Sequence, residues 1–223
     1  MTDKEQFIHL DEEGNKYYYS DREMKNLHRE DGPALEWSNG DKMCFIDGKR
    51  HREDGPAIEY ESGAKEWWVD GKRHREDGPA VEWPNGDKSW WVDGKCHRED
   101  GPAVVWSNGD KEWWVDDKRH REDGPAIEWA DGTKEWWIED QLHRTDGPAI
   151  EYADGSKQWC VNDHLHREDG PAIEGANGTK EWYINGKRLT EDEFNARISP
   201  VELTLDEIAE KFGVSVDQLK IKK

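Results

Sequence analysis

Hydrophobic and polar residues alternate along most of the chain in short runs that are separated by turn dipeptides. Residues 79–83 form one such run, an Asn-Gly pair follows at 85–86, and residues 88–92 form a second run that ends at the Asp-Gly pair 93–94. Period-two alternation of β-branched and aromatic residues predicts strands, and Asn-Gly between two strands predicts a hairpin turn. The pattern therefore predicts a β-hairpin of short strands.

The turn also predicts which side chains share a face. If Asn85 and Gly86 form a two-residue type I′ turn, Trp83 faces Lys88 and Val81 faces Trp90. One face then holds Val81, Trp83, Trp90, Val92 and the stem of Lys88, and the other holds Ala80, Glu82, Ser89, Trp91 and Asp93. We predict that the first face is the core, with the Lys88 ammonium over the Trp83 ring as a cation–π pair.

The same pattern returns every 23 residues without insertion or deletion. Each copy begins in a His-Arg-Glu-Asp-Gly-Pro-Ala segment, and the seven histidines are His28, His51, His74, His97, His120, His143 and His166. A fixed period of this length is typical of stacked arrays, in which each copy contacts only its neighbours. We therefore predict a mainly β fold, an elongated repeat array of stacked antiparallel β-hairpins at residues 28–188, after an N-terminal capping half-repeat at 1–27.

The composition changes to helix-forming residues in the C-terminal segment 189–223. Thr190 and Glu193 form a capping-box pattern, and a second helix is expected to open at Thr204. Ala209, Gly213 and Leu219 have the spacing of a helix-turn-helix unit. From Leu203 onward four acids balance four bases, which disfavours DNA contact. We expect a short α-helical C-terminal cap, with a docking module or a DNA-binding unit as alternatives.

The charge of the chain narrows the class of partner. The formal net charge is −20, and residues 28–188 carry 37 of the 52 acids and 23 of the 32 bases. Acidity is therefore a property of the repeat, which argues against nucleic acids and anionic membranes as direct partners. It favours a protein partner with a basic patch. All 14 tryptophans lie within the repeats, between Trp37 and Trp182, and their burial supplies the apolar area that orders the array.

Stacking converts each repeat position into a ladder of like residues. On the second face of the predicted hairpin, a glutamate ladder runs beside a tryptophan ladder, and aromatic residues rimmed by acids are typical of protein-binding surfaces. The predicted partner-binding residues are Glu59, Glu82, Glu128 and Glu151 in the first ladder and Trp68, Trp91, Trp114 and Trp137 in the second. The alternative is that these aromatics cover a second core layer while the glutamates keep the array soluble.

The repeated His-Arg-Glu-Asp segment carries residue types that also occur in active sites. An active site needs one constellation, whereas seven equivalent copies indicate a structural role, with Arg pairing to Glu and Asp between stacked copies. Cys44, Cys96 and Cys160 lack the paired spacing of a disulfide or metal framework. We therefore predict no enzymatic activity, no cofactor and no metal site. The polar N-terminus and the lack of a membrane-length apolar run lead us to expect a cytoplasmic protein.

The repeat unit resembles a known family. Its Asp-Gly-Pro-Ala corner, Asn-Gly turn, Lys-x-Trp-Trp run and closing Asp-Gly-Lys are similar to MORN-type repeats, in the variant found in bacterial YwqK-like antitoxins and in phage and large-virus proteins. The resemblance covers about residues 10–188, and it implies an elongated array of β-hairpins that binds proteins. Some MORN proteins bind anionic lipids, a role that the net negative charge of each copy argues against here.

Three hypotheses of function follow from the sequence. The first is a non-enzymatic acidic scaffold that binds, and thereby inhibits, a protein with a basic surface, in the manner of an antitoxin or a phage anti-defence protein. The second is a DNA-mimic inhibitor of a nuclease or another DNA-binding protein. The third is a transcriptional regulator that acts through the helix-turn-helix-like segment. The sequence leaves the oligomeric state open.

Overall fold

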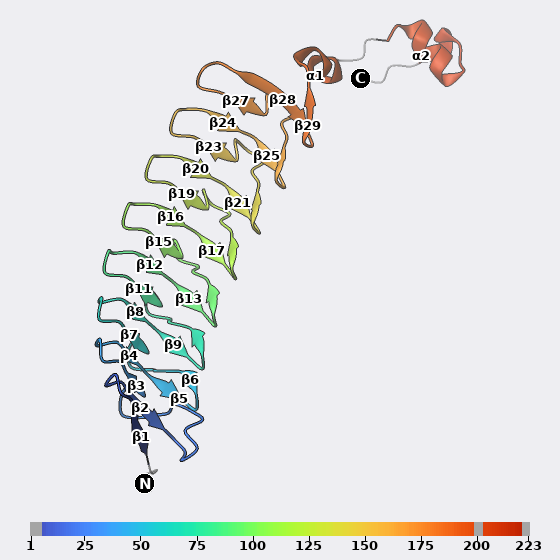
Figure 1. Ribbon diagram of the computed structural model, residues 1–223. Coiled ribbons are helices and arrows are strands. Elements are labelled where there is room, and N and C mark those ends of the chain that lie inside the picture. Colours follow the sequence, from blue (N-terminus) through green and yellow to red (C-terminus); the bar gives the residue numbers. More distant parts are fainter. Residues whose placement is uncertain (1–5, 199–202, 220–223) are drawn as a thin grey trace.

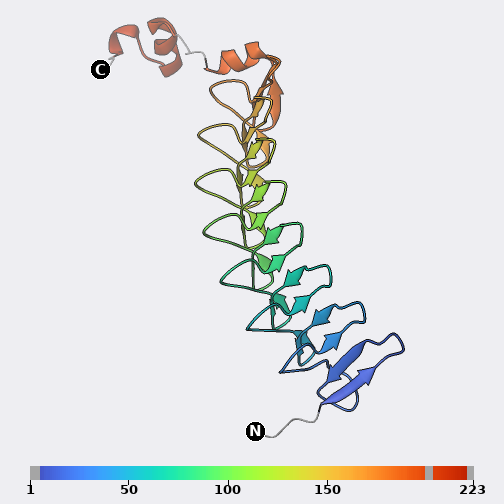
Figure 2. The ribbon, with the colours of Figure 1, turned by 90° about the vertical axis from the view of Figure 1, so that its left-hand side faces the viewer.

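The repeats form one long curved body. The computed structural model describes residues 6–198 and 203–219, and in this part the chain folds into a 17-stranded antiparallel sheet, six two-stranded sheets and two short α-helices. Successive copies follow one another along a gentle arc from the N-terminal to the C-terminal end (Figures 1 and 2). The prediction of a mainly β, elongated array of antiparallel hairpins is confirmed.

Each copy contains two hairpins. The first hairpin belongs to the long sheet, and its strands are β3 (Leu35–Glu36) and β4 (Lys42–Met43), β7 (Ile58–Glu59) and β8 (Lys65–Glu66), β11 (Val81–Glu82) and β12 (Lys88–Ser89), β15 (Val104–Val105) and β16 (Lys111–Glu112), β19 (Ile127–Glu128) and β20 (Lys134–Glu135), β23 (Ile150–Glu151) and β24 (Lys157–Gln158), and β27 (Ile173–Glu174) and β28 (Lys180–Ile184).

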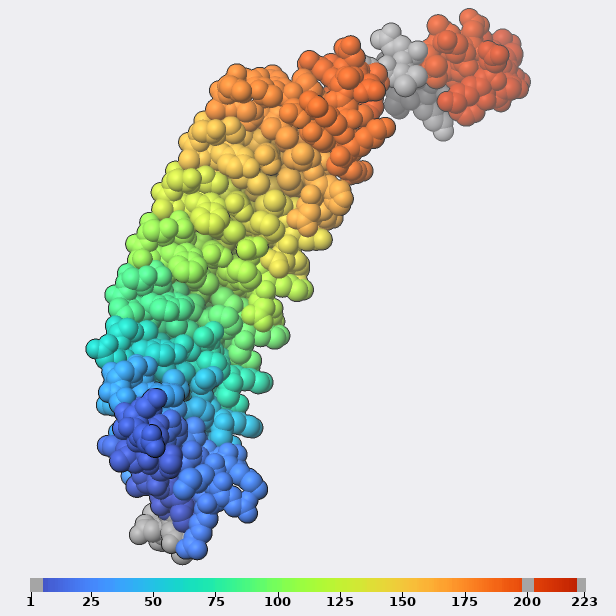
Figure 3. Space-filling model, in the orientation of Figure 1, coloured from blue at the N-terminus to red at the C-terminus, as the bar shows by residue number. Residues whose placement is uncertain are grey.

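The second hairpin follows at once and forms a small sheet of its own. Its strands are β5 (Phe45–Ile46) and β6 (Lys49–Arg50), β9 (Trp68–Val69) and β10 (Lys72–Arg73), β13 (Trp91–Val92) and β14 (Lys95–Cys96), β17 (Trp114–Val115) and β18 (Lys118–Arg119), β21 (Trp137–Ile138) and β22 (Gln141–Leu142), and β25 (Cys160–Val161) and β26 (His164–Leu165). In the last copy, β28 continues into this position and pairs with β29 (Lys187–Leu189). The second hairpins project on the inner side of the arc (Figures 1 and 3).

The register of the first hairpin differs from the prediction by one residue. Val81 pairs with Ser89 and Glu82 with Lys88. The loop is longer than the two residues predicted, because Trp83 N–H donates to Asp87 O at 3.0 Å and Gly86 N–H donates to Trp83 O at 3.0 Å. The type I′ turn predicted at 85–86 is therefore wrong: Gly86 has a positive φ of 96°, but Asn85 does not.

The slip of one residue moves the whole second strand to the other face. Ser89 now shares a buried face with Val81, and Lys88 lies opposite Glu82. The predicted Lys88–Trp83 cation–π pair and the Val81–Trp90 pairing are wrong, and Trp83, predicted as core, is 40% exposed. The two consecutive positive φ angles of a type I′ turn occur in the second hairpin instead, at Asp93 (50°) and Gly94 (83°).

Hydrogen bonds join each copy to the next at three places. Within the long sheet, β12 pairs with β15 of the next copy, so the first hairpins form one continuous ladder. The second hairpins stack through Gly94 N–H, which donates to Arg73 O at 2.9 Å. The outer loops stack through side chains, as where Ser107 N–H donates to Asp87 Oδ1 at 2.7 Å. One copy earlier, Ala64 stands in the place of Asp87 and Pro84 in the place of Ser107. Ala64 has no side-chain acceptor and Pro84 has no N–H, so this bond loses its donor and its acceptor together.

The core of the array is a narrow column. The alanine of every corner has a relative exposure of 0 or 1%, and the residues are Ala34, Ala57, Ala80, Ala103, Ala126, Ala149 and Ala172. The next residue along, such as Ile58 or Val81, is also buried in five of the seven copies and is half-buried at Val104 and Ile173. The tryptophans surround this column and remain partly exposed. Small side chains at the centre let consecutive copies approach closely, and the aromatic rings cover the gap between layers.

The two ends of the array differ. At the N-terminal end, β1 (Phe7–Leu10) pairs with β2 (Lys16–Tyr19), and β2 pairs with β3. At the C-terminal end, helix α1 (Glu191–Ile198) packs against β28 and β29, and Phe194 is 2% exposed. No helix among the described residues is long and apolar enough to cross a membrane.

The rest of the tail is only partly the unit predicted from its sequence. Helix α2 (Leu205–Phe212) begins with a capping box of Thr204 and Glu207 and ends at Gly213, whose φ is 63°. This is the helix expected to open at Thr204. The second helix that a helix-turn-helix unit needs after the turn at Gly213 is only a single 3₁₀ turn, η1 (Val216–Gln218), within the described residues, and 220–223 lie outside them. Both views of the ribbon draw α2 clear of the repeats (Figures 1 and 2). The predicted cap is therefore formed by α1.

The second turn offers a test of this fold. Asp117, Asp140 and Asp163 replace Gly94 in later copies with φ near 65°, and Asp117 accepts the Cys96 N–H at 2.8 Å. We predict that Gly94→Val lowers the free energy of unfolding by about 1–2 kcal/mol, because a β-branched residue is strained at positive φ. Gly94→Asp should cost less than half of that, because aspartate tolerates this conformation and gains the Arg73 N–H. Urea unfolding of both variants measures the difference, and equal losses would contradict it.

Candidate functional site

The predicted glutamate ladder lies in a row of alternating lysines and glutamates. Glu82 pairs with Lys65 on one side and with Lys88 on the other. From Lys16 to Lys180, all within the described residues, the same alternation crosses the long sheet and is broken at one residue: Lys16, Glu36, Lys42, Glu59, Lys65, Glu82, Lys88, Val105, Lys111, Glu128, Lys134, Glu151, Lys157, Glu174, Lys180. We call this row the charge zipper. Opposite charges directly across a strand pair stabilise a sheet.

The arginine of each corner adds a further positive charge to the zipper. Arg75 donates from Nε to Asp77 Oδ1 at 2.8 Å, and from Nη1 to Pro79 O at 3.1 Å and Glu82 Oε1 at 3.3 Å. Its Cζ lies 4.0 Å from the centre of the Trp67 ring in the preceding copy. The ion pairs predicted between copies therefore form within each copy, and it is the cation–π contact that joins neighbours.

The four glutamates of the predicted site share this environment. Each carboxylate lies close to the guanidinium of a corner arginine. The Nη1–Oε1 distances are 3.2 Å for Glu59, 3.3 Å for Glu82, 3.5 Å for Glu128 and 3.2 Å for Glu151. Their side chains are 34 to 44% exposed. Lysines on both sides and an arginine above compensate their charge, so the zipper contributes little net negative potential.

The four tryptophans of the predicted site lie elsewhere. Trp68, Trp91, Trp114 and Trp137 are partly buried, and their Nε1–H groups donate at 2.7 to 3.0 Å to Glu66, Ser89, Glu112 and Glu135. Ser89, which binds Trp91, lies on the opposite face of the sheet from its neighbour Lys88 and from Glu82, the cross-strand partner of Lys88. The glutamate and tryptophan ladders therefore do not share a face as predicted. Guanidinium groups stack on these rings, as where Arg73 lies 5.2 Å from Trp68 and 5.3 Å from Trp91. The binding role of all eight residues stays a prediction.

The corner histidines hold the second turn in place. His74 Nδ1 accepts the Asp93 N–H at 3.2 Å, and the same bond recurs in other copies at 3.1 to 3.4 Å. This contact gives the histidine of the corner a structural use in every copy where it forms. Among the described residues no group of three His, Cys, Asp or Glu side chains is arranged to hold a metal ion.

Strongly exposed negative charge lies on the same corner. Around His74 stand Glu76, 88% exposed, and Asp77, 84% exposed, and Asp93, 74% exposed, lies at the tip of the second hairpin. We call each such set of carboxylates an acidic corner. It recurs along the array at Glu30, Glu53, Glu76, Glu99, Glu122 and Glu168, with an aspartate following each of them and Thr145 interrupting the row. The sequence interpretation assigned these residues to internal ion pairs and therefore missed their exposure.

Arginine holds one carboxylate of each corner in its charged form. The hydrogen bond and the positive charge of Arg75 lower the pKa of Asp77 below its ordinary value. The pKa values of Asp31, Asp54, Asp100, Asp123, Asp146 and Asp169 are lowered in the same way by the arginine two residues before each. These seven aspartates therefore keep their negative charge further into the acid range than an unpaired aspartate.

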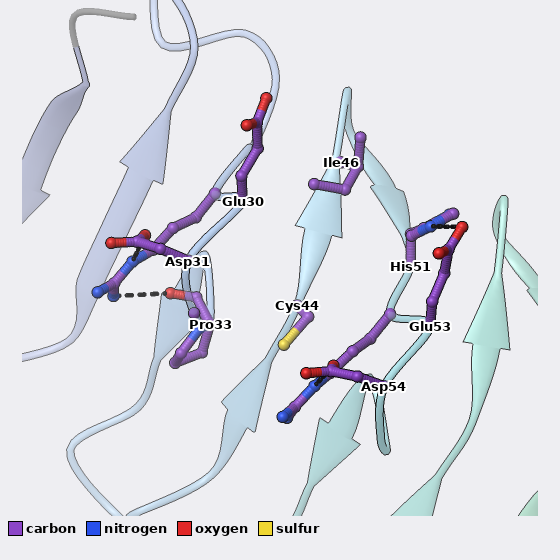
Figure 4. A pocket seen from close by; sticks show the side chains of 11 residues that line it. Glu30, Asp31, Pro33, Cys44, Ile46, His51, Glu53 and Asp54 are labelled. Carbon is purple, nitrogen blue, oxygen red and sulfur yellow. Dashed lines mark hydrogen bonds and ion pairs between the residues drawn. The ribbon is translucent and has the colours of Figure 1, made fainter. Parts of the chain in front are cut away.

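A shallow cleft separates each corner from the next. The first, of about 560 Å³, lies between residues 30–33 and 51–54. Ile46 of β5 and Cys44, which directly precedes β5, line it (Figure 4). Four similar clefts of about 550 to 710 Å³ recur further along the array. Burial raises the pKa of Cys44, and it raises that of Cys96 to about 12, so these thiols are poor nucleophiles.

No protein-family model matches the chain, and a search of curated proteins finds no match either. The resemblance to MORN-type repeats stays a prediction that rests on the repeat unit.

The corner arginines differ in one useful respect. Arg121 contacts Asp123, Pro125 O, Trp113 and Glu128, whereas the partner of Arg98 at the last position is Val105. We predict that Arg121→Lys lowers the free energy of unfolding by about 1–2 kcal/mol, because lysine cannot make the forked contact or stack as well. Arg98→Lys should lower the free energy of unfolding by about 0.5 kcal/mol less than Arg121→Lys does, because Arg98 has no glutamate partner to lose. Chemical denaturation compares the two, and a larger cost at Arg98 would contradict the prediction.

The lowered aspartate pKa values predict how stability changes with pH. A group whose pKa is lower in the folded state stabilises the fold above its unfolded pKa, and this contribution is lost as the pH falls through the folded pKa. Seven such aspartates predict that the melting temperature falls steeply below about pH 4, near the unperturbed aspartate value of about 3.9. Relief of the net negative charge acts in the opposite direction above that pH. Thermal melts between pH 7 and pH 3 test the sign, and a melting temperature that still rises at pH 3 would contradict it.

Proposed function

We propose that this protein is a non-enzymatic, MORN-like acidic scaffold that binds a protein with a basic surface and inhibits it by covering that surface. Curved repeat arrays create extended concave surfaces that suit protein partners. The inner side of this arc carries the second hairpins, whose tips bear the exposed aspartates of the acidic corners (Figures 1 and 3). That row of exposed carboxylates is the observation that carries the proposal.

The acidic corner is the better candidate surface than the charge zipper. The carboxylate of Glu76 is 88% exposed, whereas that of Glu82 is 37% exposed and lies against Arg75. Each corner therefore presents charge to solvent, and the zipper uses its charge within the sheet. Two strands per copy at about 4.8 Å separate the corners by roughly 10 Å. A partner with basic residues at a similar spacing could contact several corners at once, which multiplies weak contacts into tight binding.

The DNA-mimic hypothesis is less well supported. Duplex DNA carries one charge per ~1.7 Å, which is several charges per repeat length. A corner offers Glu76, Asp77 and Asp93, and Arg75 compensates part of this charge. The regulator hypothesis needs a recognition helix in the tail, where η1 is a single turn within the described residues. We therefore rank the protein-binding scaffold above both.

Two fourfold variants with the same change of charge separate the candidate surfaces. The corner variant carries Glu53→Gln, Glu76→Gln, Glu99→Gln and Glu122→Gln, and the zipper variant carries Glu59→Gln, Glu82→Gln, Glu128→Gln and Glu151→Gln. With fluorescent poly-L-lysine as a defined basic probe, we predict about tenfold weaker binding by the corner variant, which corresponds to about 1.4 kcal/mol. The zipper variant should bind within about twofold of the unmodified chain.

Controls decide how this comparison is interpreted. Circular dichroism confirms that both variants are folded, and duplex DNA and anionic vesicles serve as probes that should not bind. Equal weakening by the two variants would show that only the total charge matters, and a larger loss in the zipper variant would favour the glutamate ladder first predicted from the sequence. Either result would contradict the corner as the binding surface.

A further inference from the structure

The N-terminal end of the long sheet is an open edge. Strand β1 pairs with β2, and no other strand among the described residues pairs with it. Figures 1 and 2 show β1 as the outermost element at that end, whereas α1 packs on the opposite end. An unpaired edge strand presents backbone donors and acceptors to any chain that can extend the sheet.

Hydrogen bonds on the far side of β2 fix which residues of β1 present those groups. Tyr18 N–H donates to Ala34 O at 2.8 Å, and Tyr18 O accepts the His28 N–H at 2.9 Å, so both point away from β1. Ile8 lies directly opposite Tyr18. In an antiparallel pair, opposite residues either exchange both bonds or both point outward. The N–H and C=O of Ile8, and of Leu10 two residues on, therefore point to the open edge.

The side chains of the edge are apolar and exposed. Ile8 is 60% and Leu10 is 63% exposed, and they share a face because they are two residues apart. Leu10 pairs with Lys16, whose partner on the other side is Glu36. Leu10 therefore occupies a glutamate place of the charge zipper. All the other glutamate places are filled by glutamate, except the one taken by Val105. The edge strands of natural sheets usually carry a charged side chain that discourages pairing with another chain. Here Leu10 stands where a glutamate would supply that charge.

We propose that β1 pairs antiparallel with β1 of a second copy of this chain, so that the two long sheets become one. In the register that keeps the apolar face together, Ile8 lies opposite Leu10 of the second copy, Leu10 opposite its Ile8, and the two His9 residues meet on the twofold axis. Both Ile8–Leu10 pairs then exchange backbone hydrogen bonds, because these are the residues whose groups point outward. The pairing is self-complementary, as a twofold interface must be.

Charge favours a second copy over a basic partner at this edge. Residues 7–10 carry no Asp, Glu, Lys or Arg in a chain of net charge −20, so two acidic chains can meet here without opposing like charges. The same register places Phe7 opposite Asp11 of the second copy, and the Arg22 guanidinium lies 5.8 Å from the centre of the Phe7 ring. Arg22 thus brings a positive charge towards that carboxylate.

Restoring the ladder glutamate tests the proposal. Sedimentation equilibrium of the full chain at tens to hundreds of micromolar should give twice the monomer mass of 26.1 kDa. Leu10→Glu should remain monomeric, because it places glutamates opposite the apolar edge, and it should still fold, because glutamate fills the equivalent place in other copies. Phe212→Glu is the matched control at an exposed apolar residue of α2 and should dimerise like the unmodified chain.

A cross-link tests the register independently. His9→Cys places two thiols at a non-hydrogen-bonded pair, where Cα atoms are about 4.5 Å apart, close enough for a disulfide. Mild oxidation should give a covalent dimer with His9→Cys and much less with the control Gln6→Cys, since Cys44, Cys96 and Cys160 are buried. A monomeric unmodified chain, a dimer that survives Leu10→Glu, or equal cross-linking at both positions would each overturn the proposal.

Discussion

The corner arginine is the contact on which the rest of the array depends. It binds an aspartate, a proline carbonyl and, in most copies, a glutamate of its own copy. In five of the seven copies its guanidinium also lies on a tryptophan of the copy before, as Arg121 does at 4.2 Å from Trp113. A planar cation with five donors can do both at once, and lysine cannot. The array needs such a contact because its central column is mostly alanine, which buries little area for each copy.

This use of arginine also decides where charge reaches solvent. Arginine and two lysines compensate each zipper glutamate such as Glu82, so the acidity of the repeat is expressed at Glu76 and Asp93 instead. Exposed glutamates such as Glu76 and ion-paired glutamates such as Glu82 thus occupy separate surfaces of one repeat, although most copies contain both kinds. The proposed binding surface and the stability of the fold therefore depend on different glutamates.

The sequence predicted the architecture well, because the 23-residue period and the turn glycines are strong local signals. It failed on the register, since Asn85-Gly86 is compatible both with a two-residue turn and with the longer loop that Trp83 and Asp87 close. This one-residue error in the register placed Lys88, Trp83 and Trp91 on the wrong faces. The acidic corner was missed for another reason. Adjacent Arg, Glu and Asp predict ion pairs, but only geometry shows that Asp77 meets Arg75 while Glu76 points to solvent.

The coupling between neighbouring copies is the quantity that tests this picture most directly. A double-mutant cycle on Arg121→Gln and Trp113→Leu, read by chemical denaturation, isolates the contact between one copy and the next, because glutamine removes the cation. A coupling free energy of about 1 kcal/mol is expected for a partly buried cation–π pair. Additive effects of the two substitutions, with a coupling near zero, would contradict the central place given to the corner arginine.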